Sequence, residues 1–106
     1  MTAWLLLASA ILCEVGATLA LKRALDHPVM YVVVAIGYIA SLILLTRTLR
    51  EGLGIGLAYG VWAGCGVALA AIGSKVFFNE PLNGVMIVGI TLIIGGVLLV
   101  ELGASS

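Results

Sequence analysis

The sequence predicts an all-α integral membrane protein in which four helices of one chain form a single transmembrane domain. Its 106 residues are 63% apolar and 9% charged, and the mean hydropathy is +1.30. Soluble domains are less apolar, and about a quarter of their residues are charged. The apolar residues fall into four segments long enough to cross a bilayer, near residues 3–21, 29–46, 54–78 and 82–102.

Composition also excludes several classes of protein. The formal net charge is zero, so the chain lacks the basic surface of a nucleic-acid-binding protein. Cys13 and Cys65 fall inside apolar segments without metal-ligand spacing, and we interpret both as reduced packing residues. The chain offers no nucleophile–base pair, so we expect no enzyme, cofactor or metal site. No basic residue precedes the first apolar run, so we expect that helix to stay in the mature protein.

The first segment, WLLLASAILCEVGATLAL, carries the acid Glu14 near its middle and no basic residue. A charged residue at a bilayer centre costs at least about 2.5 kcal/mol, so an intramembrane acid indicates a functional site. The alternative is a polar residue that only bonds a neighbouring helix. At helical spacing the Glu14 face also contains Leu7, Ala10, Ile11, Ala17 and Thr18, whose small members leave room for a ligand beside the carboxylate.

The second segment places Tyr38 and Ser41 on one face, three residues apart. Tyr38 lies too deep for an interfacial aromatic residue, and we expect its hydroxyl to find a partner in the bundle, with Glu14 as the natural candidate. His27 precedes Pro28 in the preceding connection, where an exposed loop residue is a better interpretation than a proton relay.

The third segment is rich in glycine. Gly52, Gly56, Gly60 and Gly64 recur every four residues, a pattern that allows another helix to approach closely and lowers the cost of bending. Tyr59 and Trp62 lie on the adjoining surface, where Trp62 is either a stacking platform for an organic cation or an ordinary packing residue.

The fourth segment has no ionisable residue until Glu101 and carries a stripe of small and apolar residues at helix-pairing spacing. We expect this stripe to form the dimer contact, through Gly89, Leu92, Ile93, Gly96 and Val97.

Four short helices with one acid enclose too little volume for a transport pathway, so the sequence favours an oligomer, with a dimer as the smallest unit that surrounds one cavity with two copies of Glu14. The connections on one side carry Lys22, Arg23 and Lys75, and those on the other carry Arg47 and Arg50. This weak bias permits insertion in either orientation and therefore an antiparallel pair of one sequence.

Such a cavity suggests exchange of protons for a cation. Removal of a carboxylate from water favours its protonated form, and a cation that binds the ionised form competes with the proton. If the loaded dimer opens to one side at a time, a proton gradient drives cation export.

Five stretches together resemble the small multidrug resistance transporters of the quaternary-ammonium type, over essentially the full chain. They are AILCEVGATLALK around Glu14, IGYIAS around Tyr38, GIGLAYGVWAGCG around Trp62, FFNEPL, and GITLIIGGV in the fourth segment. The resemblance implies an antiparallel dimer in the bacterial cytoplasmic (inner) membrane that exports lipophilic or quaternary cations in exchange for protons.

By the same resemblance, Glu14 is the shared proton and substrate site, with Tyr38, Tyr59 and Trp62 as its partners. Gly64 and Gly66 would mark a bend in the third helix. The cavity lining would comprise Trp4, Leu7, Ala10, Ile11, Ala17, Thr18, Ser41 and Ala63.

Two positions depart from the patterns of related branches. Trp4 stands where the multidrug type usually has Tyr, and Ala17 stands where the guanidinium-exporting branch usually has Trp. We therefore favour larger cations over guanidinium. An exporter of guanidinium or a polyamine, one subunit of a heterodimer, and a structural membrane subunit remain as alternatives.

Overall fold

A computed structural model describes residues 2–105, which form four helices: α1 (Thr2–Ala24), α2 (Met30–Arg50), α3 (Ile55–Phe78) and α4 (Gly84–Ser105). Each helix is long and apolar enough to cross a bilayer. The 23 residues of α1 span about 35 Å, compared with a hydrocarbon core of about 30 Å. The all-α, four-helix membrane fold is confirmed.

Two helices extend beyond the expected apolar segments. α1 continues through Lys22 and Arg23, and α2 continues to Arg50. Lys and Arg are good helix formers, and their positive charge is favourable beside the carbonyl end of a helix. The basic residues expected in connections therefore form the last helical turns.

Polar caps set the boundary between α3 and α4. Asn79 adopts the left-handed conformation with φ 53°, and its N–H donates to the Lys75 carbonyl, which ends α3. The Asn83 side chain accepts a hydrogen bond of 3.0 Å from the Met86 N–H, so α4 begins at Gly84 and not at residue 82.

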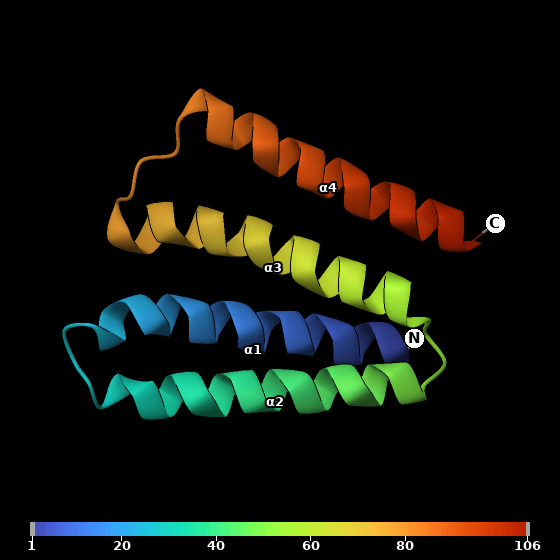
Figure 1. Ribbon diagram of the computed structural model, residues 1–106, viewed down its shortest axis with the longest axis horizontal. Helices are drawn as coiled ribbons and strands as arrows, with labels where there is room; N and C mark the ends of the chain where they lie inside the picture. Colours follow the sequence, from blue (N-terminus) through green and yellow to red (C-terminus); the bar gives the residue numbers. More distant parts are fainter. Residues whose placement is uncertain (1, 106) are drawn as a thin grey trace.

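The four helices lie side by side in the spatial order α2, α1, α3, α4, as Figure 1 shows. The molecule measures 46 × 34 × 17 Å, so it is a flat layer and not a closed bundle. α1 packs closely against α2 and also contacts α3, whereas α4 contacts α3 and no other helix of the described chain. The surface of α4 that does not pack against α3 is therefore open, and so are the outer faces of the other helices.

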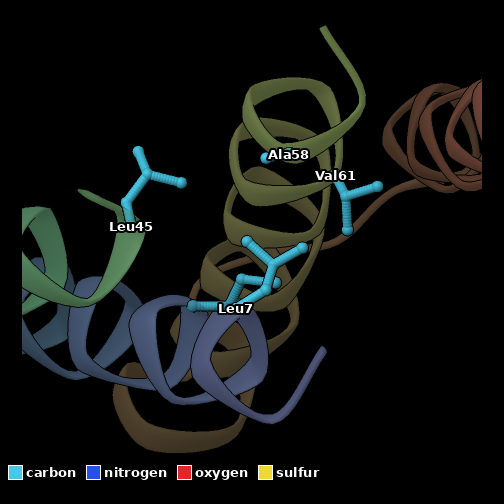
Figure 2. Close-up of a cluster of buried hydrophobic side chains, with 5 residues drawn as sticks. Leu7, Leu45, Ala58 and Val61 are labelled. Carbon is cyan, nitrogen blue, oxygen red and sulfur yellow. The ribbon is translucent and has the colours of Figure 1, made fainter. Parts of the chain in front are cut away.

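The buried core is small and lies where α1, α2 and α3 meet. It comprises Leu7, Ile11, Leu45, Ala58 and Val61, most of which are labelled in Figure 2. Because lipid tails are as apolar as leucine, helix association in a membrane depends on close packing and hydrogen bonds and not on removal of apolar surface from water. Many large apolar side chains on the outer faces are correspondingly exposed, as expected for contact with lipid.

Candidate functional site

Glu14 lies in the middle of α1 and directs its carboxyl group at α3. The two helices meet at Gly66, and a methyl group at that position would lie 2.6 Å from Glu14 Oε1 and closer still to Oε2. Only a residue without a side chain leaves room for the carboxyl group. The missing side chain of Gly66 is therefore what permits the carboxyl group to occupy this position.

One carboxyl oxygen of Glu14 is buried without a partner. Oε2 has no hydrogen bond to any group of residues 2–105. A buried polar atom without a partner costs free energy, about 1–3 kcal/mol, and more when it is charged. A group with this cost is poised to bind a proton or a cation.

A hydrogen-bonded link lies one helical turn after Glu14. The Thr18 hydroxyl donates to the Glu14 backbone carbonyl at 2.9 Å, and its oxygen lies 2.6 Å from the Tyr38 hydroxyl oxygen. Because Thr18 has a single hydroxyl proton, Tyr38 is the donor of the second bond. The expectation that Tyr38 pairs with the Glu14 side chain is therefore wrong for this conformation, since the Tyr38 hydroxyl donates its hydrogen bond to the Thr18 oxygen.

A matching link lies one turn before Glu14. The Ser41 hydroxyl donates to the Ala10 backbone carbonyl at 2.7 Å, and the Trp62 indole N–H donates to Ser41 at 3.0 Å. Ser41 is fully buried, so this link holds α2 and α3 to α1 and fixes the Trp62 ring. Glu14 thus lies between two polar links that carry Tyr38 and Trp62.

Tyr59 is brought to the site through Trp62. The two rings have centroids 5.5 Å apart and an angle of 40° between their planes. Tyr59 is 55% exposed, so its ring forms part of an open surface of α3 and not of the core. An exposed aromatic surface of this kind can stack against an organic cation.

The expected lining residues divide into two groups. Trp4 is exposed, and Thr18 and Ala63 are partly buried. The others are buried between helices of the subunit, where they serve packing: Leu7, Ala10, Ile11, Ala17 and Ser41. Ala17, for example, packs beneath Gly37 of α2, where an added methyl group would lie 2.8 Å from its Cβ.

Gly64 and Gly66 accommodate neighbouring side chains. α3 is helical without interruption from Ile55 to Phe78, and Gly64 lies under Val97 of α4 just as Gly66 lies under Glu14. Their observed role is close contact between helices, and a bend at these positions stays a prediction.

Part of the α4 stripe packs within the subunit. A methyl group at Gly64 would lie 2.6 Å from Val97 Cγ2 and 3.5 Å from Ile93 Cγ2, so these two residues pack against α3 of the same subunit. Both residues remain partly exposed, so a dimer contact through Ile93 and Val97 also stays a prediction. Leu92 and Gly96 are exposed and Gly89 is partly exposed, so a contact through them stays a prediction.

Sequence reasoning missed the role of Gly37 and an ion pair between Lys22 and Glu80. Gly37 has a small partner, Ala17, on the neighbouring helix, but a lone glycine in an apolar segment gives no sign of which helix it faces. Lys22 Nζ lies 2.9 Å from Glu80 Oε2 and joins the end of α1 to the α3–α4 connection. No group of three or more potential metal-ligating residues occurs within residues 2–105.

Comparisons with known proteins identify a family for the chain. A family model described as Small Multidrug Resistance protein matches residues 2–93. The multidrug resistance protein EbrB of Bacillus licheniformis is 42% identical over 103 residues, which cover 95% of this chain and 86% of that protein. The match to the family includes α1, α2, α3 and the first half of α4.

Proposed function

Because the chain belongs to the Small Multidrug Resistance family, a family of oligomeric membrane transporters of small cations, we propose that it is a proton-coupled antiporter that exports lipophilic or quaternary ammonium cations. It is a multi-pass protein of the bacterial cytoplasmic (inner) membrane. The relative EbrB carries the name multidrug resistance protein, which supports a broad range of substrates.

The observation that carries this proposal is the Glu14 carboxyl group. It is the acid in the middle of a membrane span, and its Oε2 is buried without a hydrogen-bond partner within residues 2–105. A structural acid that only joins helices would be expected to accept hydrogen bonds from neighbouring donors at both carboxyl oxygens. The nearest polar links instead use the backbone carbonyls of Ala10 and Glu14, so the carboxyl group stays available.

A single carboxyl group that can bind either a proton or an organic cation supports exchange of one for the other. A proton neutralises the carboxylate, and an organic cation binds it only when the proton has left. Occupancy by one therefore excludes the other. A protein that changes its open side only when Glu14 is occupied would convert a proton gradient into cation export.

The open layer supports assembly into a dimer. Within residues 2–105, α4 contacts only α3, and the subunit, whose shortest extent is 17 Å, is too thin to surround a ligand. A second copy would enclose the site and place two Glu14 side chains around it. The near balance of positive charge between the two ends permits an antiparallel pair.

The aromatic residues support a larger, apolar cation. Tyr59 and Trp62 present adjoining rings, each able to interact with a cation by about 0.5–2 kcal/mol. A guanidinium ion would be better served by a tight set of hydrogen-bond acceptors.

Transport current from purified protein in liposomes tests the proposal. We expect current when the liposomes are challenged with a tetra-alkylammonium ion, and loss of that current in Glu14→Gln, which keeps the shape of the side chain but cannot ionise. Glu51→Gln is the control, because Glu51 is an exposed acid at the end of α2.

Other outcomes would assign the chain differently. Current with guanidinium alone would contradict the multidrug proposal and indicate a narrow exporter. Absence of current with both cations, in protein that is folded and oligomeric, would indicate a missing partner subunit or a structural role. Current that persists in Glu14→Gln would exclude Glu14 as the exchange site.

A further inference from the structure

The contact between α1 and α3 is packed unevenly along its length. At the end where both helices begin, the hydrophobic core fills the space between them, with Leu7 and Ile11 of α1 opposite Ala58 and Val61 of α3. At the end where both helices finish, their axes diverge in Figure 1. Two cavities of about 280 Å³ and about 240 Å³ lie there beside α1, and Phe78 of α3 lines both. α3 is therefore held firmly at one end and loosely at the other.

Two contacts join the loosely packed ends of the two helices. Gly73 of α3 lies against Leu19 of α1, since an added methyl group would be 2.9 Å from Leu19 Cδ1. Closer to the helix ends, Lys22 Nζ lies 2.9 Å from Glu80 Oε2, in the one salt bridge among the residues that the structure describes. One small apolar contact and one ion pair thus hold this end of α3.

The same contact between helices leads inward to the acid of the candidate site. α1 and α3 meet at three successive levels, which are, from the middle of the layer outward, Glu14 with Gly66, Leu19 with Gly73, and Lys22 with Glu80. An opening that starts at the end of α3 must separate the two outer contacts before it reaches the Glu14 carboxyl group. The outer contacts therefore cover the acid from this end of the molecule.

Both partners of the ion pair are fixed to helices. Lys22 lies inside α1, two residues before its end. Glu80 follows α3, but its N–H donates to the Ser74 carbonyl at 3.3 Å, and the N–H of Asn79 donates to the Lys75 carbonyl at 3.1 Å. These bonds satisfy carbonyl groups of the last helical turn, so Glu80 moves together with α3. The ion pair consequently joins one helix to another, and not a helix to a mobile loop.

The ion pair is weak enough to open repeatedly. The Lys22 and Glu80 side chains are 55% and 38% exposed, so water can solvate each charge when the two separate. Exposed ion pairs of this kind change an equilibrium by no more than about fivefold. This pair can therefore set how often the end of α3 separates from α1 without preventing the separation.

We propose that the end of α3 moves away from α1 about its firmly packed end, and that Lys22 and Glu80 form a latch that holds this end closed over Glu14. Because the role of the motion rests on the cation exchange proposed for Glu14, the latch is first measured without any cation. When the latch is broken, the helices separate more often and a cation enters and leaves the site faster.

Labelling of a cysteine at position 19 measures the opening. In full-length protein whose two native cysteines are replaced by alanine, Leu19→Cys lies against Gly73 and reacts faster with a water-soluble maleimide the more often the helices separate. We expect Lys22→Gln to raise the labelling rate about twofold to fivefold. Arg23→Gln is the matched control, because Arg23 is the next residue, is exposed and forms no salt bridge within residues 2–105.

A charge swap separates the ion pair from the charge of either residue alone. Glu80→Gln should raise the labelling rate as much as Lys22→Gln does, and the double variant should exceed neither. Lys22→Glu combined with Glu80→Lys rebuilds the pair and should restore the original rate. A direct effect of charge on the thiol would instead change the rate in opposite directions in the two single variants, and that result would overturn the latch.

Release of tetraphenylphosphonium connects the latch to the site. We expect Lys22→Gln and Glu80→Gln each to raise the dissociation rate about twofold to fivefold at unchanged Kd, since entry and release become faster by the same factor. Labelling rates equal to those of the unsubstituted pair in both variants would exclude the latch. Faster labelling with unchanged release would overturn its control of access to Glu14. Absence of tetraphenylphosphonium binding, with labelling that responds as expected, would contradict the proposed function and support the latch.

Discussion

At the scale of residues, the site depends on the pairing of Glu14 with Gly66. The carboxyl group occupies the space that any side chain at position 66 would fill. A carboxyl group at the end of a flexible side chain can turn away from an added methyl group at little cost in stability. Gly66 therefore controls where the acid lies more than it controls whether the protein folds.

Gly66→Ala should displace the Glu14 carboxyl group without unfolding the chain. Because a displacement of about 1 Å at a reacting group can cost about 100-fold, we expect cation affinity to fall by about 10-fold to 100-fold. Titration of purified protein with tetraphenylphosphonium measures the affinity. Gly16→Ala is the control, since a methyl group there meets no neighbour within 4 Å. Equal affinity of the two variants would show that Gly66 does not position the acid.

The sequence alone singles out Glu14, because an acid in an apolar span is conspicuous whatever its neighbours are. It did not identify the partner of Tyr38. Glu14 and Thr18 lie one turn apart on the same face of α1, and helical periodicity does not distinguish which of the two a side chain on α2 meets. The structure selects Thr18, whose oxygen lies 2.6 Å from the Tyr38 hydroxyl.

At the scale of elements, the glycines of α3 define how α4 packs. Gly60 and Gly64 face Val100 and Val97, and a methyl group at Gly64 would collide with Val97. A valine on a helix cannot turn aside as a carboxylate does, because both its methyl groups are fixed close to the backbone. A side chain at Gly64 therefore forces α4 away from α3.

Gly64→Ala should lower the free energy of unfolding by about 1–3 kcal/mol, as overpacking does elsewhere, even though alanine favours helix over glycine. Combining it with Val97→Ala should restore part of the loss by removing the collision. Unfolding in mixed micelles at increasing denaturing detergent measures both. Gly56→Ala, where the added methyl group meets nothing within 4 Å, should be neutral or stabilising. Equal loss in Gly56→Ala and Gly64→Ala would contradict the assigned contact.

The helices themselves could be predicted from hydropathy, but their partners could not. The same stripe of small and apolar residues fits a contact within one subunit or between two, because packing at a glycine groove uses the same geometry in both. Ile93 and Val97, expected in a dimer contact, pack against α3 of their own chain. The ends of α1 and α2 were placed too early, since the basic last turns are helical without being apolar.

At the scale of the whole molecule, the flat layer and the distribution of charge bear on assembly. Lys22, Arg23 and Lys75 lie toward the end at which α1 and α3 finish, and Arg47 and Arg50 lie toward the other end (Figure 1). A difference of one positive charge gives little preference for either orientation. The chain therefore suits a pair in which the two copies are inverted.

Replacing both Arg47 and Arg50 with glutamine should fix a single orientation. One end of the molecule then carries three positive charges and the other end carries none. If the active unit is an antiparallel dimer of this chain, export of a quaternary ammonium ion should be lost. Fusion of a topology reporter to the C-terminus measures orientation, and cell growth in the presence of the cation measures export.

Lys75→Gln combined with Arg50→Gln is the matched control. It also removes two charges but keeps the difference of one, so it should retain both orientations and export. Full export by the double variant Arg47→Gln and Arg50→Gln in one fixed orientation would exclude an antiparallel homodimer.

The central claim is that protons and organic cations compete for Glu14, and the affinity of purified protein for tetraphenylphosphonium as a function of pH tests it most directly. A cation that must displace one proton binds more weakly as pH falls, so the apparent Kd should rise by about tenfold per pH unit below the titration of Glu14 and become constant above it. Glu14→Gln should bind weakly at every pH and show no slope. A wild-type Kd that does not change with pH, or a slope that survives in Glu14→Gln, would contradict competition at this carboxyl group.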